Sequence, residues 1–224
     1  MMLVNEIIFV AHVSLVSLAT ILFARLSKEA LVAYISLLFV IANIFVIKQV
    51  QLWGWYATSA DAFIIGVSFG INLLQETWGK SIARQTVWIS FACSAFYMIM
   101  AQFLLAYHPA AGDGTHLHFV QLMSNTQRII LASFVSYIIT QMADTYLYAY
   151  VRRRTNDKYF VARNYLSMCS SQLFDTILFS FLGLYGIMQN ILHIMIVSYA
   201  LKLFAIMLTT PFLMSAKKIV KKGT

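Results

Sequence analysis

The stretch "RIILASFVSYIITQMADTYLYAYVRRR", Arg128 to Arg154, decides the fold class of this chain. It is apolar over more than the roughly 20 residues that a membrane-spanning helix needs, and three arginines close it. Gln141 and Asp144 nevertheless lie well inside it. An ionisable side chain at the bilayer centre costs about 2.5–3.5 kcal/mol, so such residues usually face a cavity or a partner. We therefore expect Asp144 to face the interior of a helix bundle.

A second apolar run, "SSQLFDTILFSFLGLYG" from Ser170 to Gly186, repeats the unit Gln-x-x-Asp-Thr as Gln172, Asp175 and Thr176. Depths counted at about 1.5 Å per residue from Arg152 and Arg163 place each glutamine level with the aspartate of the other span. An inverted repeat produces this arrangement and would gather two carboxylates and two amides near the midplane. The alternative is that the four side chains only join helix to helix.

The composition is that of an all-α integral membrane protein. The chain is 61% hydrophobic and 11% charged, with a mean hydropathy of +0.77, whereas soluble domains are about a quarter charged. Its length allows roughly seven spans of about 20 residues each. The first apolar segment follows Asn5 and Glu6 rather than basic residues and has no Ala-x-Ala site, so we interpret it as a retained span.

Apolar runs bounded by charges or turn residues predict seven transmembrane helices, at residues 6–24, 30–50, 57–77, 84–107, 128–151, 164–187 and 190–214. With the N-terminus outside, thirteen of the sixteen basic residues fall on the cytoplasmic side: Arg25, Lys28, Lys80, Arg84, Arg152, Arg153, Arg154, Lys158, Arg163, Lys217, Lys218, Lys221 and Lys222. The positive-inside rule therefore favours an N-out, C-in orientation. The net charge of +8 then reflects orientation and lipid contact, so no nucleic-acid partner is expected.

Lys202 is a further deep polar residue, too far from Lys217 to reach the interface easily. We expect it to face an acid, with Asp175 nearest in depth and Asp144 the alternative. Such a pair could be purely structural or could work in function.

Three more polar residues lie in the second and third spans. Asn72 and Glu76 are four residues apart and share a helix face. Glu76 could pair with Lys80 or Arg84 or could contact a ligand. Asn43 adds an amide in the outer half of the second span.

No catalytic or cofactor motif accompanies these residues. The sequence contains no nucleophile elbow, Walker loop or His-Glu-x-x-His, and Cys93 and Cys169 are isolated in apolar runs. We therefore expect no enzyme, no cofactor, no metal site and no disulfide.

The segment "NIFVIKQVQLWGWYATSADAFIIGVSFGINLLQETWGKSIAR", together with "QMADT", "QLFDTILF" and "YALKLFAIMLTTP", resembles the queuosine precursor transporter family, formerly described as vitamin uptake transporters. The resemblance covers about residues 30–214 and implies a six-helix transporter core. Residues 1–29 would then be an additional N-terminal transmembrane helix, and residues 215–224 a basic cytoplasmic tail. The family's function implies an importer of 7-deazaguanine bases (preQ0, preQ1 or queuine) in the bacterial inner membrane, feeding tRNA modification.

The resemblance also implies site residues. The family's acidic residues in the fifth and sixth spans correspond to Asp144 and Asp175, and the glutamate before the Gly-Lys turn corresponds to Glu76. Asn72 is a departure, because many members have an acidic residue there. With the amides identified above, the predicted substrate-binding residues are Asp144, Asp175, Gln141, Gln172, Glu76, Asn72, Asn43 and Lys202.

The predicted partners are a small nucleobase substrate and the lipid bilayer, and the sequence leaves a monomer and a homodimer both open. A rival interpretation is a substrate-capture subunit of an energy-coupling vitamin or nucleobase uptake system, which needs a separate ATPase.

The topology yields a direct prediction. A reporter fused after Thr224 or inserted near Asp157 should report the cytoplasm, and one inserted at Asp113 should report the outside, because the basic loops stay in the cytoplasm. Reporter activity measures the side of each site. A cytoplasmic signal at Asp113 would contradict the predicted number of spans.

Overall fold

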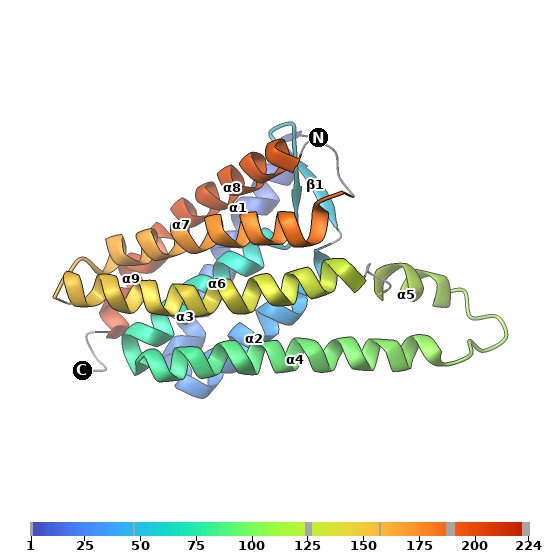
Figure 1. Cartoon of the computed structure of the whole chain (residues 1–224), viewed down its shortest axis with the longest axis horizontal. Coiled ribbons are helices and arrows are strands. Elements are labelled where there is room, and N and C mark those ends of the chain that lie inside the picture. The colour runs from blue at the N-terminus through green and yellow to red at the C-terminus, as the bar shows by residue number, and fades with distance from the viewer. Residues whose placement is uncertain (1, 47, 124–126, 157, 187–190, 221–224) are drawn as a thin grey trace.

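Long helices make up most of the computed structural model, which describes residues 2–46, 48–123, 127–156, 158–186 and 191–220 (Figure 1). Over these residues the long helices are α1 (Met2–Leu26), α2 (Lys28–Phe45), α3 (Asp61–Trp78), α4 (Lys80–Ala106), α6 (Gln127–Arg154), α7 (Phe160–Phe179) and α8 (Ile191–Leu208). The shorter elements are the hairpin β1 (Gln49–Leu52) and β2 (Trp55–Thr58), α5 (His116–Met123), the π-helical turn η1 (Ser180–Leu184) and α9 (Thr210–Val220).

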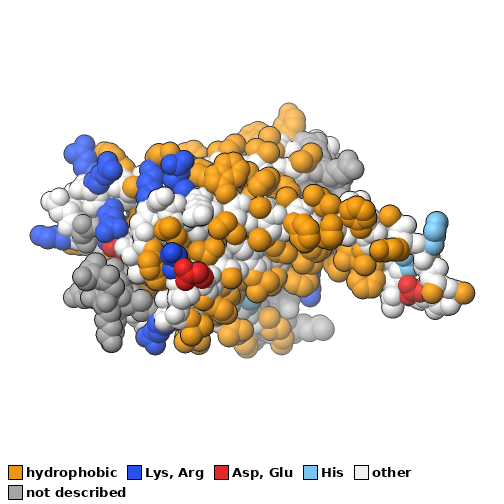
Figure 2. All heavy atoms as spheres, turned by 90° about the horizontal axis from the view of Figure 1, so that it is seen from below, with side chains coloured by type: hydrophobic (Ala, Val, Ile, Leu, Met, Phe, Trp, Pro, Cys, Tyr) orange, Lys and Arg blue, Asp and Glu red, His pale blue; other side chains and the backbone are white. Residues whose placement is uncertain are grey.

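The predicted helical membrane protein is confirmed in its main feature. Four helices in the described residues are long and apolar enough to cross a membrane: Val4–Leu26, Lys28–Phe45, Lys80–Ala106 and Ile191–Leu208. The long helices α3, α6 and α7 are less apolar because they carry most of the buried polar residues. Figure 2 shows hydrophobic side chains over the middle of the molecule. Such a surface suits contact with lipid tails.

Charge is separated along the long axis of the bundle. The α3–α4 and α6–α7 connections lie at one end with the C-terminus, and the N-terminus, the hairpin and α5 lie at the other (Figure 1). Lys and Arg side chains gather at the first of these ends (Figure 2), which we call the basic end. This is the separation that the sequence predicts, and the orientation relative to a membrane stays a prediction.

The hairpin corrects two predicted spans and the purely α-helical description. α2 ends at Phe45, and residues 49–58, predicted to belong to the spans 30–50 and 57–77 or to their connection, form two paired strands. The turn between them places Trp53 and Gly54 at φ of 48° and 83°, as a two-residue hairpin turn requires. Glu6 accepts a hydrogen bond from the Trp53 amide at 2.7 Å and so ties this turn to α1.

The predicted last span, 190–214, is two helices rather than one. α8 ends at Leu208 and α9 begins at Thr210. Pro211 lies in the first turn of α9, where its missing N–H is tolerated, and it disfavours a continuous helix through the preceding residues. Residues 187–190, where the sixth predicted span ends and the seventh begins, lie outside the described residues, as do 221–224 of the predicted tail.

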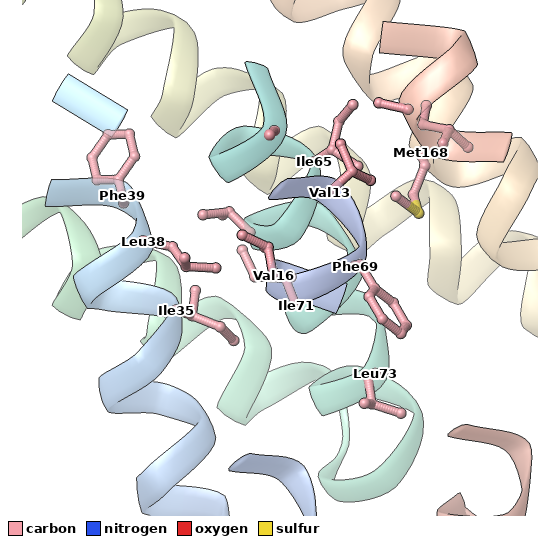
Figure 3. Close-up of a cluster of buried hydrophobic side chains, with 14 of the residues drawn as sticks. Val13, Val16, Ile35, Leu38, Phe39, Ile65, Phe69, Ile71, Leu73 and Met168 are labelled. Carbon is pink, nitrogen blue, oxygen red and sulfur yellow. The ribbon is translucent and has the colours of Figure 1, made fainter. Parts of the chain in front are cut away.

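The apolar core is built around α3. The buried apolar side chains of α1, α2 and α3 form one cluster, in which Figure 3 shows Ile65 of α3 beside Val13 of α1. α1 therefore packs into the same core as the helices within residues 30–214. A Cβ atom built on Gly66 would lie 2.3 Å from the Val16 side chain, so only glycine permits this close approach of α1 and α3.

Gly66→Ala is expected to destabilise the protein by about 1–3 kcal/mol, because the added methyl group overpacks the contact with Val16. Gly114→Ala is the matched control, since a Cβ there meets nothing within 4 Å. Thermal unfolding in detergent compares the two variants. An unchanged midpoint for Gly66→Ala would contradict the tight α1–α3 contact.

Candidate functional site

A cavity of about 470 Å³ lies inside the bundle, toward the hairpin. Its walls come from α2, the hairpin, the start of α3, α6, α7, η1 and α8. The polar and charged side chains that line it are Asn43, Gln49, Tyr56, Thr58, Asp61, Ser133, Tyr137, Gln141, Asp175, Thr176, Ser180, Ser198 and Lys202. This volume and mixed lining are typical of small-molecule sites.

Three charged side chains line this cavity: Asp61, Asp175 and Lys202. Lys202 Nζ lies 2.8 Å from Asp175 Oδ2 and also donates to the Thr176 hydroxyl at 3.2 Å. The predicted pairing of Lys202 with Asp175 is therefore confirmed. The buried Asp61 carboxylate interacts electrostatically with both members of this pair. When all three are ionised they sum to one negative charge.

Asp61 is the main lining residue that sequence reasoning missed. It lies in the first turn of α3, where a carboxylate is common because it complements the positive end of the helix dipole. The distinguishing feature is its burial, which follows from the hairpin that precedes it and also lines the cavity. The position of a carboxylate directly after a hairpin could have indicated that Asp61 is buried, but the sequence analysis did not predict the hairpin.

An amide and two rings form the opposite part of the wall. Asn43 donates to the Phe39 carbonyl and to Ser94, each at 3.0 Å, and accepts from Ser133 at 2.7 Å. Its orientation is therefore fixed between three helices. The rings of Phe39 and Tyr137 stack with centroids 3.6 Å apart. Both side chains line the cavity and add aromatic groups to its wall.

The two glutamines of the repeated motif share a serine of α3 as their partner and do not bind the aspartates. The amide groups of Gln141 and Gln172 both donate to the Ser68 hydroxyl of α3, at 3.2 Å and 2.9 Å. Asp144 and Asp175 therefore lie on opposite sides of this level, since α6 and α7 pack as neighbours in opposite directions. The prediction that each glutamine lies level with the other span's aspartate is wrong.

The reason for this error is Arg163. It was assumed to lie in a cytoplasmic segment and served as a depth reference, but it is 1% exposed inside the bundle. Its guanidinium lies 2.6 Å from Glu76 Oε1, and Tyr148 donates to Glu76 Oε2 at 2.7 Å. Glu76 thus pairs with Arg163, not with Lys80 or Arg84. Lys80 instead lies 3.3 Å from the centroid of the Tyr146 ring.

Asp144 lies away from the cavity. Its carboxylate accepts a hydrogen bond from Ser167 of α7, and Asn72 of α3 is fully buried in the same three-helix region. Of the eight predicted site residues, the structure brings four to the cavity: Asn43, Gln141, Asp175 and Lys202. The other four, Asp144, Gln172, Glu76 and Asn72, lie between α3, α6 and α7 outside its lining.

No group of three or more His, Cys, Asp or Glu side chains that could hold a metal ion occurs in the described part of the chain. The cavity instead offers carboxylates, an ammonium group, amides, hydroxyls and aromatic rings. These groups can bind a polar, planar molecule by hydrogen bonds, charge and stacking. A multi-pass helical membrane protein with such a cavity has the architecture of a small-molecule transporter.

Comparison with known proteins agrees with this class. Residues 59–216 match the family described as "Putative vitamin uptake transporter". The chain is also 30% identical over 197 residues to a protein of Bacillus subtilis (strain 168) named "Probable queuosine precursor transporter", and the match covers 86% of each chain. No solved structure matches. The chain belongs to the queuosine precursor transporter family.

The Lys202–Asp175 pair can be tested by thermal unfolding. Lys202→Met should destabilise the protein by about 3–5 kcal/mol, because it leaves a largely buried carboxylate without its partner. The double variant Lys202→Met with Asp175→Asn should recover much of this loss. Lys158→Met, at an exposed lysine, is the control. Equal stability of the single and double variants would show that the pair does not couple.

Proposed function

We propose that this protein imports queuosine precursors, the 7-deazaguanine bases queuine, preQ1 or preQ0, across the bacterial inner membrane for tRNA modification. Family membership supports a transporter of this class. The observation that carries the substrate assignment is the cavity, because it combines two carboxylates, three amides and aromatic rings in a space of about 470 Å³.

The chemistry of the base matches the cavity at several points. A deazaguanine presents N1–H and a 2-amino group as adjacent donors, and one carboxylate can accept from both. Asp61 has this role in our proposal, since Asp175 is already engaged by Lys202. The amide of Gln141 binds the polar edge of the ring in this proposal, and the aromatic side chains of the lining contact the ring itself.

Charge favours the cationic members of this substrate class. Asp61, Asp175 and Lys202 together leave one negative charge in a low-dielectric site. The aminomethyl cation of preQ1 or queuine would neutralise that charge, whereas preQ0 is neutral. We therefore expect preQ1 and queuine to bind more tightly than preQ0.

The orientation in this proposal is N-out and C-in, with the basic end in the cytoplasm. The hairpin and α5 then lie at the outer side, and the cavity is on the hairpin side of the bundle. The Glu76–Arg163–Tyr148 cluster lies toward the basic end and joins α3, α6 and α7 there. In this proposal the substrate passes from the cavity toward the basic end, and the cluster closes that part of its path in the conformation described here.

Uptake of labelled queuine, preQ1 and preQ0 tests the proposal, in cells that lack their own synthesis and transport and express this chain alone. Asp61→Asn and Asp175→Asn should each lower uptake at least tenfold at normal membrane abundance. Loss of a charge-assisted hydrogen bond costs about 1.5–3 kcal/mol, roughly ten to a hundred and fifty fold in binding. Asp113→Asn, in the exposed outer loop, is the control.

The outcomes separate the alternatives. If the wild type takes up a base and both variants take it up equally well, the cavity is rejected as the substrate site. Uptake that requires a co-expressed ATPase would favour the capture subunit of an energy-coupling system. No uptake of any of the three bases under either condition would reject the proposed substrates.

A further inference from the structure

A seam of buried polar side chains runs between α3, α6 and α7, from the inner edge of the cavity toward the basic end. We call it the polar seam; its members are Ser68, Asn72, Gln75, Gln141, Asp144, Ser167 and Gln172. Each of them is at most 2% exposed. Only Gln141 also lines the cavity, so the seam is a separate feature from the proposed substrate site.

Two sets of cross-helix contacts bound the seam. At the cavity side, Ser68 accepts from both glutamine amides of the repeated motif. At the basic side, the Gln75 amide donates to the Thr145 carbonyl at 2.9 Å. Asn72 follows Ser68 by one helical turn, about 6 Å, and Asp144 follows Gln141 by about 4.5 Å. Asn72 and Asp144 therefore lie at similar levels between the two contacts.

Oxygen acceptors without partners concentrate in this seam. Among the described residues, no hydrogen bond reaches Oδ2 of Asp144 or Oδ1 of Asn72. The same holds for the Oε1 atoms of Gln75, Gln141 and Gln172. Among the nitrogen atoms of these described side chains, Nδ2 of Asn72 alone has no partner. A buried polar atom without a partner costs about 1–3 kcal/mol, so five oxygen atoms without any partner, one of them in a carboxylate, favour a positively charged ligand.

The charge of that ligand follows from the ion pairs around the seam. Glu76 is engaged by Arg163, and Asp175 by Lys202. None of the salt bridges found in the described residues includes Asp144, whose side-chain contact is the Ser167 hydroxyl. One uncompensated carboxylate calls for one positive charge, and a divalent ion would leave a surplus charge in the bilayer interior.

The number of acceptors favours a metal ion over a proton. A proton on Asp144 would satisfy Oδ2 and at most one further acceptor. A hard metal ion binds several carboxylate, amide and hydroxyl oxygens at once. We propose that the polar seam binds one monovalent alkali-metal cation, with Asp144 as counter-ion and the oxygens of Asn72, Gln75, Gln141 and Gln172 as its available ligands. This inference goes beyond the proposed function, because it does not depend on which base is carried.

Purified full-length protein in detergent, without any base, provides the test. At fixed pH and ionic strength, the unfolding midpoint should rise with the logarithm of Na⁺ concentration when NaCl replaces choline chloride, as ligand linkage requires. Radioactive Na⁺ should bind to the wild type at one ion per chain. KCl in place of NaCl shows which alkali ion is preferred.

Asp144→Asn should bind Na⁺ at least tenfold more weakly and lose the rise in midpoint. Asp61→Asn, which changes an acid of the cavity and not of the seam, is the matched control and should keep both. Asn72→Leu retains the Asp144 carboxylate and removes a neutral ligand, so it should weaken Na⁺ binding several-fold. If Asp144→Asn does not fold, Na⁺ binding by Asn72→Leu tests the proposal in its place.

Identical midpoints in NaCl, KCl and choline chloride, with no bound Na⁺, would overturn the proposal. A midpoint that depends on pH and not on the metal ion would also overturn it and would assign a proton to Asp144. These readouts contain no transport step, so they can succeed or fail independently of the uptake of queuosine precursors.

Discussion

The bilayer offers no hydrogen-bond partner to a polar side chain, and this constraint organises the whole structure. The chain places most of its buried polar groups on α3, α6 and α7, and their partners lie on the facing helices. α3 contacts each of the other long helices in the described structure, so it connects the apolar packing against α1 and α2 with the polar contacts to α6 and α7. A polar substitution on α3 thus affects both the apolar packing and the polar contacts.

Polar chemistry changes in character along the axis of the bundle. Near the hairpin, Lys202 and the two cavity acids form an accessible charged site. In the middle, the seam is dominated by amide and carboxylate oxygens and contains no cationic side chain among its members. Toward the basic end, Glu76 is held by Arg163 and Tyr148. The cavity and the seam each hold one negative charge when their acids are ionised, whereas Glu76 is paired with Arg163, so a cationic solute meets a different electrostatic environment at the basic end.

Sequence reasoning succeeded where burial cost gave a strong signal. A lysine deep in an apolar span requires an acid, and Asp175 was the nearest candidate by depth. Gln141, Asp144 and Gln172 are also buried inside the bundle as expected, and Asp175 lines the cavity. The functional roles of the eight predicted site residues stay predictions, and the structure divides the residues between the cavity, the seam and, for Glu76, the cluster with Arg163.

What the sequence could not supply was the register between elements. Arg163 looks like a cytoplasmic flanking residue in one dimension, and only the facing Glu76 and Tyr148 explain its burial. Asp61 looks like an ordinary first-turn carboxylate until the hairpin covers it. The hairpin in turn was hidden because residues 49–58 lie between two long apolar runs and contain aromatic residues common at membrane interfaces.

The hairpin gives the N-terminal helix a mechanical connection to the cavity. Glu6 of α1 holds the backbone of the turn at Trp53, while Gln49, Tyr56 and Thr58 on the two strands form part of the cavity wall. Two strands paired by backbone hydrogen bonds move as one stiff ribbon rather than as a loose loop. A tilt of α1 would therefore be transmitted to one side of the cavity through the Glu6 contact and through the hydrogen bond from Asn5 to the Gln51 carbonyl, with the rest of α1 remaining anchored at Gly66.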